Sequence, residues 1–496
     1  MAWHIVPSIP FLCHHPNPLA KNALMNTQSQ NAFVPDPGEL PTIDAQAMFP
    51  KPLDIRLAPD MKRDMPPLRP LHGVTNYAPL GGIAMDYPLD ARALLQDLHL
   101  PYAYFHDDVY VSSGKDVIDV SRIFPLFGAD ENDPANYWFA ETDDYLRQVV
   151  DDGLKVIYRL GESIECGENR YRTFPPKDFG KWTRICLNII RHYTEGWADG
   201  FHWDMQDWAV WEEPNNPNLW HGPFEDYLRL YKLFSVEFKA AFPHLHVGGP
   251  STTTLGYRFL EQFLTFVEAE RLPLDFVNYT AYYLTPAEFL SESVKRREMM
   301  DCHGFANIPL WTTEWHCSPF WHDFADPVAY GRERCRFGGT EGAAFAAVIL
   351  CGLQDTPVQR ACFYSAHIGG GYGLLDMENR PTPTYHVFRI FSRLFMDSVR
   401  RVALDIQNAS SNTQAILSQN RHGDLELFSG CFSRVEGTLT FQIPAGFTVK
   451  EIRILDDLGA ADFREPEAGR IALEGGACRL RKYACATAFH LRLERD

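Results

Sequence analysis

The chain has 496 residues, of which 45% are hydrophobic and 22% are charged, and its formal net charge is −18. This composition is ordinary for a soluble globular protein, and the length allows a barrel of roughly 250–350 residues plus a smaller domain. The negative charge argues against a nucleic-acid partner, because no basic face is available to neutralise phosphates.

The sequence lacks clear signals for a membrane, for secretion and for a cofactor. No apolar run approaches the roughly 20 residues that a membrane span needs. The first residues lack the basic region and the cleavage site of a signal peptide. The 11 cysteines are odd in number and without CxxC spacing, which favours a reducing, cytoplasmic location. The histidines form no persuasive ligand pattern, so we expect no metal and no cofactor.

In chain order, residues 1–50 are rich in Pro, Asn and Gln and are interpreted as an irregular N-terminal arm. Residues 51–69 contain PLDIRLAP, which predicts a strand that joins a C-terminal β-sandwich. In residues 70–397, short apolar runs alternate with amphipathic helices, as is typical of repeated βα units. Eight strands are predicted, at residues 71–78, 101–108, 154–161, 207–214, 245–251, 274–283, 308–315 and 359–366.

Eight helices are predicted between and after these strands, which is the alternation that a closed (β/α)8 TIM barrel requires. Residues 398–496 change to short, often alternating segments bounded by Gly, Asn and Asp. This pattern predicts an accessory antiparallel β-sandwich domain.

Two of the predicted barrel strands end in glutamates. The fourth ends in WAVWEEPNN, with Glu212 and Glu213 before Pro214, and the seventh ends in LWTTEWHC, with Glu314. Barrel enzymes place catalytic groups at the C-terminal ends of their strands, and strands four and seven face one another across the barrel. A carboxyl pair of this kind is what glycoside hydrolysis needs. The alternative is a pair of solvated loop glutamates, but each lies beside a Trp and ends an apolar strand.

Other polar residues end the second and third predicted strands. His106 and Asp107 end the second strand, and both side chains are suited to contacts with vicinal sugar hydroxyls. Arg159 and Glu162 end the third strand. A structural ion pair between Arg159 and one of these acids is an equal alternative to a role in binding.

The WEEPNN and TTEWHC motifs resemble the Asn-Glu-Pro-Asn and Thr-Glu-Trp motifs of glycoside hydrolase clan A, and of family 39 in particular. Roughly two thirds of the chain takes part in the resemblance. It includes LRPLHGVTNY (68–77), HVGGPSTT (246–253), LDFVNYTAYYLTP (274–286) and GGGYGLLDMENRPTPTYHVFRIFSRL (369–394).

The resemblance implies a retaining glycosidase in which Glu213 is the general acid/base and Glu314 is the nucleophile. It also places Tyr282 near the nucleophile and His106 near a hydroxyl of the terminal sugar. For Tyr282, packing in the barrel is an equal alternative. Further candidates for substrate contacts are Asp107, Trp211, Asn215 and Trp315, and the two tryptophans are equally compatible with a place in the core.

Three positions depart from the family pattern. Glu212 stands where the family has an Asn that donates a hydrogen bond to the 2-hydroxyl of the sugar, and an ionised carboxylate can only accept there. His316 stands where the family has an Asn, and Thr280 where it has a His. We therefore expect Glu212 and His316 to alter the contacts with the terminal sugar.

The predicted function is that of a retaining exo-glycosidase, β-xylosidase-like by resemblance, that acts on an oligosaccharide or glycoside. An α-L-arabinofuranosidase, another exo-glycosidase or a transglycosidase on the same scaffold is the first alternative. A non-catalytic carbohydrate-binding barrel is the second. Because β-domains of related enzymes often support oligomers, a homo-oligomer is also possible.

Overall fold

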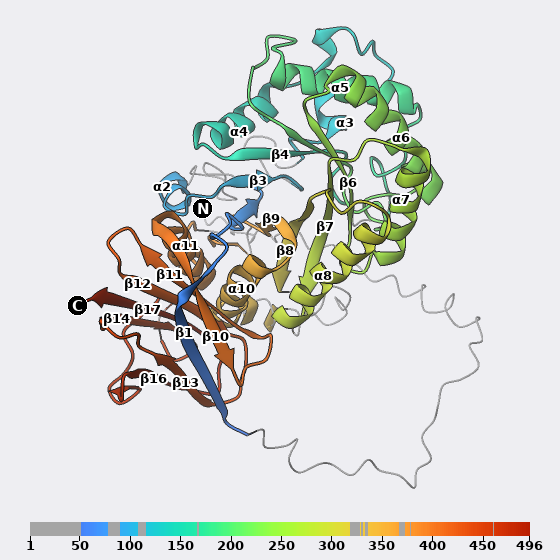
Figure 1. The fold of residues 1–496 in the computed structure, drawn as a ribbon. Coiled ribbons are helices and arrows are strands. Elements are labelled where there is room, and N and C mark those ends of the chain that lie inside the picture. The colour runs from blue at the N-terminus through green and yellow to red at the C-terminus, as the bar shows by residue number, and fades with distance from the viewer. Residues whose placement is uncertain are drawn as a thin grey trace.

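The structure is a computed structural model that describes residues 51–77, 90–107, 116–165, 168–317, 328, 331–332, 336–366, 373–376, 378–459 and 461–496. The predicted N-terminal arm lies outside these residues. Eight parallel strands close into a barrel in chain order, and a separate nine-stranded sheet lies beside it (Figure 1). The predicted fold class, a (β/α)8 barrel with an accessory β domain, is confirmed.

The barrel strands are short and almost wholly buried. Each pairs with the next in the chain, and the last closes the ring by pairing with the first. Aromatic and small side chains, among them Tyr104, Phe276 and Trp311, fill its interior. The strands are β2 (Gly73–Thr75), β3 (Tyr102–Tyr104), β4 (Lys155–Leu160), β5 (Asp207–Val210), β6 (His246–Thr252), β7 (Phe276–Tyr283), β8 (Leu310–Cys317) and β9 (Val358–Phe363).

Helices surround the barrel strands (Figure 1). They are α2 (Arg92–Gln96), α3 (Val120–Ile123), α4 (Ala140–Asp151), α5 (Phe179–Thr194), α6 (Phe224–Ala241), α7 (Tyr257–Glu270), α8 (Pro286–Cys302), α10 (Thr340–Gly352) and α11 (Pro383–Asp397). Local sequence marks the start of some of them: α8, for example, begins with a capping box between Thr285 and Glu288 and with Pro286 in its first turn. Among the described helices, none is long and apolar enough to cross a membrane.

Helix α10 differs from the others because it is apolar on every side. Each of its residues from Glu341 to Gly352 is buried. The helix contacts β8 on the barrel side and β11 and β12 of the second sheet on the other, so both halves of the protein cover it. It therefore joins the accessory domain to the barrel through a continuous core.

The second sheet has the order β14-β17-β12-β11-β10-β1-β13-β16-β15 and encloses its own apolar core. Its strands are β1 (Leu53–Met65), β10 (Ser398–Gln407), β11 (Thr413–Asn420), β12 (Leu425–Cys431), β13 (Gly437–Gln442), β14 (Phe447–Leu455), β15 (Ile471–Glu474), β16 (Ala477–Lys482) and β17 (Thr487–Arg495). Strand β1 precedes the barrel in the chain but lies between β10 and β13. It pairs in parallel with β13, so the sheet is mixed and the prediction of a purely antiparallel domain is wrong at this pairing.

Candidate active site

Strand β7 brings the two predicted catalytic glutamates to one side of the barrel mouth. The Thr280 hydroxyl donates to Glu213 Oε1 at 2.6 Å, and the Tyr282 hydroxyl donates to Glu314 Oε2 at 2.7 Å. Side chains two apart on a strand point to the same face. The carboxyl groups of Glu213, after β5, and of Glu314, on β8, therefore converge on the same face of β7.

Glu314 keeps one carboxylate oxygen without a hydrogen bond. Its Oε2 accepts from Tyr282, whereas Oε1 has no partner within the part of the chain that the structure describes. Burial raises the pKa of this carboxyl, and the nearby Glu212 and Glu213 add to the effect, while His106 opposes it. Oε1 lies 4.0 Å from Nε2 of His106. Oε1 of Glu314 is therefore a buried acceptor without a donor among the described residues.

Glu213 has both carboxyl oxygens bound by donors. Oε1 accepts from Thr280, and Oε2 accepts from the Asn216 amide at 2.8 Å. Burial raises the pKa of Glu213, and these two donors partly offset that rise. A carboxyl whose pKa is raised holds its proton closer to neutral pH, as a general acid must.

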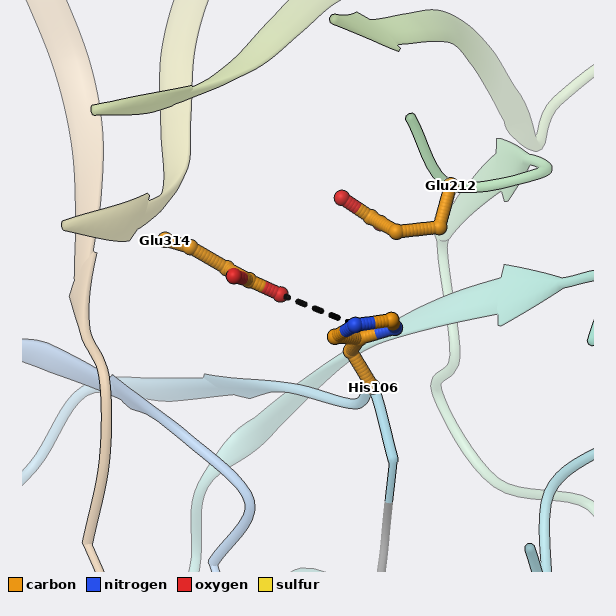
Figure 2. A group of neighbouring side chains, drawn as sticks. All are labelled: His106, Glu212 and Glu314. Atoms are coloured by element: carbon orange, nitrogen blue, oxygen red, sulfur yellow. Dashed lines mark ion pairs between the residues drawn. The ribbon is translucent and has the colours of Figure 1, made fainter. Parts of the chain in front are cut away.

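Glu212 is also fully buried and lies next to Glu314 (Figure 2). Its Oε1 accepts from the Ser251 hydroxyl at 2.7 Å, and its Oε2 accepts from the Tyr104 hydroxyl. Burial and the charge of Glu213 raise the pKa of Glu212 to about 7. The residue that replaces the expected Asn thus lies beside the candidate nucleophile.

His106 supplies the positive charge among these acids. Its Nε2 lies 3.1 Å from Oδ2 of Asp107, and Asp107 Oδ1 accepts from the backbone N–H of Ile164 at 2.7 Å. Burial lowers the pKa of His106, but Asp107, Glu314 and Glu212 together raise it well above its usual value. An imidazolium at this position offsets part of the negative charge of the pocket.

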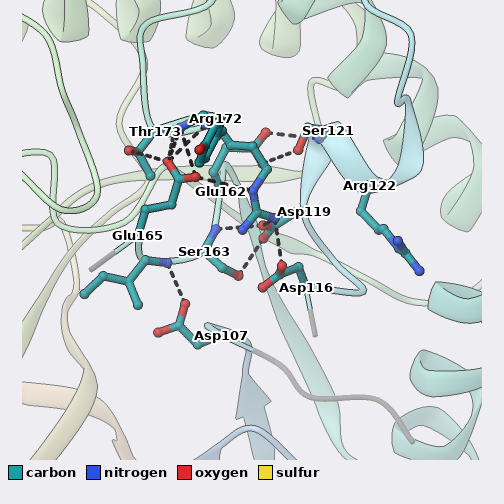
Figure 3. Close-up of polar contacts among 12 residues, drawn as sticks. Asp107, Asp116, Asp119, Ser121, Arg122, Glu162, Ser163, Glu165, Arg172 and Thr173 are labelled. Carbon is teal, nitrogen blue, oxygen red and sulfur yellow. Dashed lines mark hydrogen bonds and ion pairs between the residues drawn. The ribbon is translucent and has the colours of Figure 1, made fainter. Parts of the chain in front are cut away.

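A polar network lies beside Asp107 (Figure 3). Asp119 accepts from Nη2 of Arg159 at 2.9 Å and from the backbone N–H of Ser163 at 2.8 Å, and it pairs with Arg172 at 3.0 Å. Arg159 does form a structural ion pair, but its partner is Asp119 and not one of the acids at the ends of the predicted strands; both side chains of the pair are fully buried. The network fixes the loop after β4, which in turn holds Asp107 through Ile164.

We expect Asp119→Ala to destabilise the protein by roughly 3–5 kcal/mol, because it leaves the buried guanidinium of Arg159 without its partner. Urea unfolding followed by circular dichroism measures the change. The control is Asp130→Ala, at an exposed position, where we expect a change within about 0.5 kcal/mol. Equal stability of the two variants would contradict a structural role for the ion pair.

Other predicted site residues lie away from the pocket. Trp211 is buried, donates from Nε1 to the Leu219 carbonyl at 2.7 Å and packs against Trp220. Trp315 is buried against Phe363. Of the alternatives that the sequence left open, these contacts favour core packing for both tryptophans.

Asn215 and His316 make contacts within the protein. The Asn215 amide donates to Oγ1 of Thr253 at 2.6 Å and accepts from the Thr253 backbone N–H at 3.0 Å, so it joins the loops after β5 and β6. His316 is buried, with Nδ1 2.7 Å from the Cys317 carbonyl oxygen. Asn215 therefore supports the loop that carries Glu213.

Sequence reasoning did not single out the side chains that hold Glu212, namely Tyr104 and Ser251. Tyr104 precedes His106 by two positions, so the period of two in a strand places both on one face. The sequence alone could therefore have indicated Tyr104 as a residue of the site. Ser251 lies within the buried part of β6, and only the closed barrel shows that it meets Glu212.

Paired acidic side chains at the mouth of a (β/α)8 barrel are characteristic of glycoside hydrolases. Residues 120–428 match the sequence profile of glycosyl hydrolases family 39, and the chain belongs to this family. A beta-xylosidase from Geobacillus stearothermophilus is 30% identical over 247 residues, which cover 44% of this chain and 47% of that protein. A beta-xylosidase from Caldicellulosiruptor saccharolyticus is 25% identical over 304 residues, which cover 56% of each protein.

The chain thus spans about half the length of these two relatives. Among solved structures, a glucosidase from Croceicoccus marinus superposes with a TM-score of 0.68 at 19% identity, covering 90% of this chain and 100% of that one. At this identity the superposition supports the fold alone. The family resemblance that the motifs indicated is confirmed.

Proposed function

We propose that the protein is a retaining glycoside hydrolase that cleaves a terminal glycosidic bond, with Glu314 as nucleophile and Glu213 as general acid/base. The observation that carries this proposal is the pair of hydrogen bonds from Thr280 and Tyr282, which aim two buried carboxyl groups from different strands at one side of β7. Burial raises the pKa of both carboxyls. Glu314 keeps an oxygen without a hydrogen-bond partner among the described residues, whereas both oxygens of Glu213 accept hydrogen bonds. A double displacement requires two such carboxyl groups, and the match to the motifs of family 39 supports the assignment of the two roles.

In the first step, Oε1 of Glu314 attacks the anomeric carbon while Glu213 gives its proton to the departing oxygen. The charge of His106 favours the ionised form of Glu314 before the attack. In the second step, Glu213 takes a proton from water, and the resulting nucleophile releases the sugar from Glu314 with net retention. Membership of family 39 supports this assignment.

We propose a β-xylosidase-like specificity, because the two relatives named above are beta-xylosidases. An α-L-arabinofuranosidase, another exo-glycosidase or a transglycosidase would use the same two carboxyl groups. A panel of aryl glycosides tests the sugar, and the reaction with added sugar acceptors separates hydrolysis from transfer. A β-xyloside is expected to be the best substrate, and absence of turnover on the whole panel would favour the non-catalytic barrel.

We further propose that residues 70–397 form the catalytic domain and that residues 398–496, with the strand of residues 51–69, form the accessory domain. A cytoplasmic location and a homo-oligomer also stay predictions. Seven of the eight described cysteines are buried, which is compatible with a reducing compartment.

The proposed role of Glu213 predicts a change in pH dependence for Thr280→Val. The Thr280 hydroxyl donates to the ionised carboxylate and thereby lowers its pKa, so its removal raises the pKa of Glu213. The acid then stays protonated to higher pH, and the falling alkaline limb of the kcat/KM profile moves upward. Thr252→Val is the matched control, because the Thr252 hydroxyl is buried without a hydrogen-bond partner among described residues. A downward shift, or an equal shift in both variants, would contradict the assignment.

A further inference from the structure

Three buried side chains at the barrel mouth form a cluster that the sequence does not bring together. His106, Glu212 and Glu314 follow or lie on β3, β5 and β8, and one possible ligand atom from each lies within 4.8 Å of the other two (Figure 2). Their exposed fractions are 5%, 0% and 3%. Glu212, which replaces the expected Asn, is the residue that makes this a three-ligand cluster.

The cluster holds buried polar atoms without partners. Oε1 of Glu314 and Nδ1 of His106 have no hydrogen-bond partner within the described ranges, and Oε1 points at the His106 ring. A buried acceptor without a donor is costly. His106 is also a single cationic group that faces the acidic groups of Asp107, Glu212 and Glu314. The cluster therefore has an unused acceptor, Oε1 of Glu314, and more acidic groups than cationic ones.

Both carboxylates of the cluster are oriented by neighbours. Tyr104 and Ser251 bind Glu212, and Tyr282 binds one oxygen of Glu314. Hydrogen-bonded outer partners of this kind orient the carboxylate ligands of metal ions. In Glu314 the bound oxygen leaves the other free to coordinate.

We propose that His106, Glu212 and Glu314 bind a divalent transition-metal ion, with Zn²⁺ as the probe, and that the bound ion inhibits the enzyme by occupying the candidate nucleophile. One imidazole and two carboxylates favour Zn²⁺ over Mg²⁺ and Ca²⁺, which prefer oxygen ligands alone. Zn²⁺ lies about 2.0–2.2 Å from nitrogen and oxygen ligands, so small side-chain rotations complete the site. Binding is independent of the proposed function, and only the inhibition rests on it.

Coordination through Nε2 of His106 replaces a proton. This nitrogen is the one that lies 4.0 Å from Glu314 Oε1 and 3.1 Å from Asp107 Oδ2. The ion takes the lone pair of the neutral imidazole, and the proton leaves to solvent. No redox step is involved.

Isothermal titration calorimetry of the full-length protein with ZnCl2 tests the binding. We expect the wild-type protein to bind one Zn²⁺ ion. The affinity of Glu212→Gln for Zn²⁺ should be at least about tenfold lower. Titration with MgCl2 should show no binding of Mg²⁺ at this site. Glu162→Gln is the matched control, because Glu162 is a buried glutamate at the same end of the barrel that binds Ser121 and lies outside the cluster. It is expected to bind Zn²⁺ as the wild type does.

His106→Gln is a second variant in which the affinity for Zn²⁺ is expected to fall by the same factor. Circular dichroism shows which variants are folded. A wild-type protein without a Zn²⁺ site overturns the proposal. Unchanged affinity in folded Glu212→Gln and His106→Gln also overturns it, because the ion then binds elsewhere. Where an aryl glycoside is turned over, Zn²⁺ is expected to compete with it. Since calorimetry needs no turnover, the failure of the proposed function and the failure of the metal site are separate results.

Discussion

Glu314→Ala is expected to lower kcat/KM by several orders of magnitude on every glycoside that the wild-type protein hydrolyses. Without this carboxylate no covalent glycosyl-enzyme can form. Each order of magnitude corresponds to about 1.4 kcal/mol of lost transition-state stabilisation. Initial rates with aryl glycosides measure the loss. Glu298→Ala, at an exposed position of α8, is the control and is expected to keep full activity.

Addition of azide to the Glu314→Ala variant tests the role of the nucleophile more directly. Azide is small enough to occupy the space left by the Glu314 side chain and to attack the anomeric carbon directly. One displacement in place of two gives a glycosyl azide of inverted configuration, which NMR identifies. A variant with nearly normal activity, or a rescued product of retained configuration, would show that Glu314 is not the nucleophile.

Much of the fold could be predicted because each βα unit carries its own local signals. The buried strands are short apolar runs. The start of a helix such as α8 is marked in the sequence by Thr285, Pro286 and Glu288. The parallel pairing of β1 with β13 had no such signal. It depends on how a strand from before the barrel fits between two strands from after it, which is a matter of tertiary packing.

The residues of the candidate site that lie at the ends of barrel strands could be predicted from the sequence. Glu213, Glu314 and His106 each end an apolar run, and the barrel brings such ends together. The contacts between strands were not predictable, because they depend on register. The hydrogen bond of Thr280 with Glu213 joins residues 67 positions apart, and that of Tyr104 with Glu212 joins residues 108 positions apart.

Glu213→Ala is expected to separate the two catalytic steps by their dependence on the leaving group. Substrates with poor leaving groups should lose activity by roughly 10²–10⁴-fold, since positioned general acids typically contribute this much. A dinitrophenyl glycoside needs no proton for departure, so its first step should be nearly unaffected. Pre-steady-state release of dinitrophenol measures that step.

The second step of Glu213→Ala lacks its general base, so the glycosyl-enzyme should accumulate on Glu314. Azide needs no base, and it should restore turnover and give a glycosyl azide of retained configuration, the opposite outcome to Glu314→Ala. Glu212→Gln is the control, because Glu212 adjoins Glu213 in sequence but is held by Tyr104 and Ser251. It should weaken binding or shift the pH optimum without the leaving-group dependence. If Glu212→Gln shows that dependence and Glu213→Ala does not, Glu212 is the acid/base, and the assignment within WEEPNN is wrong by one residue.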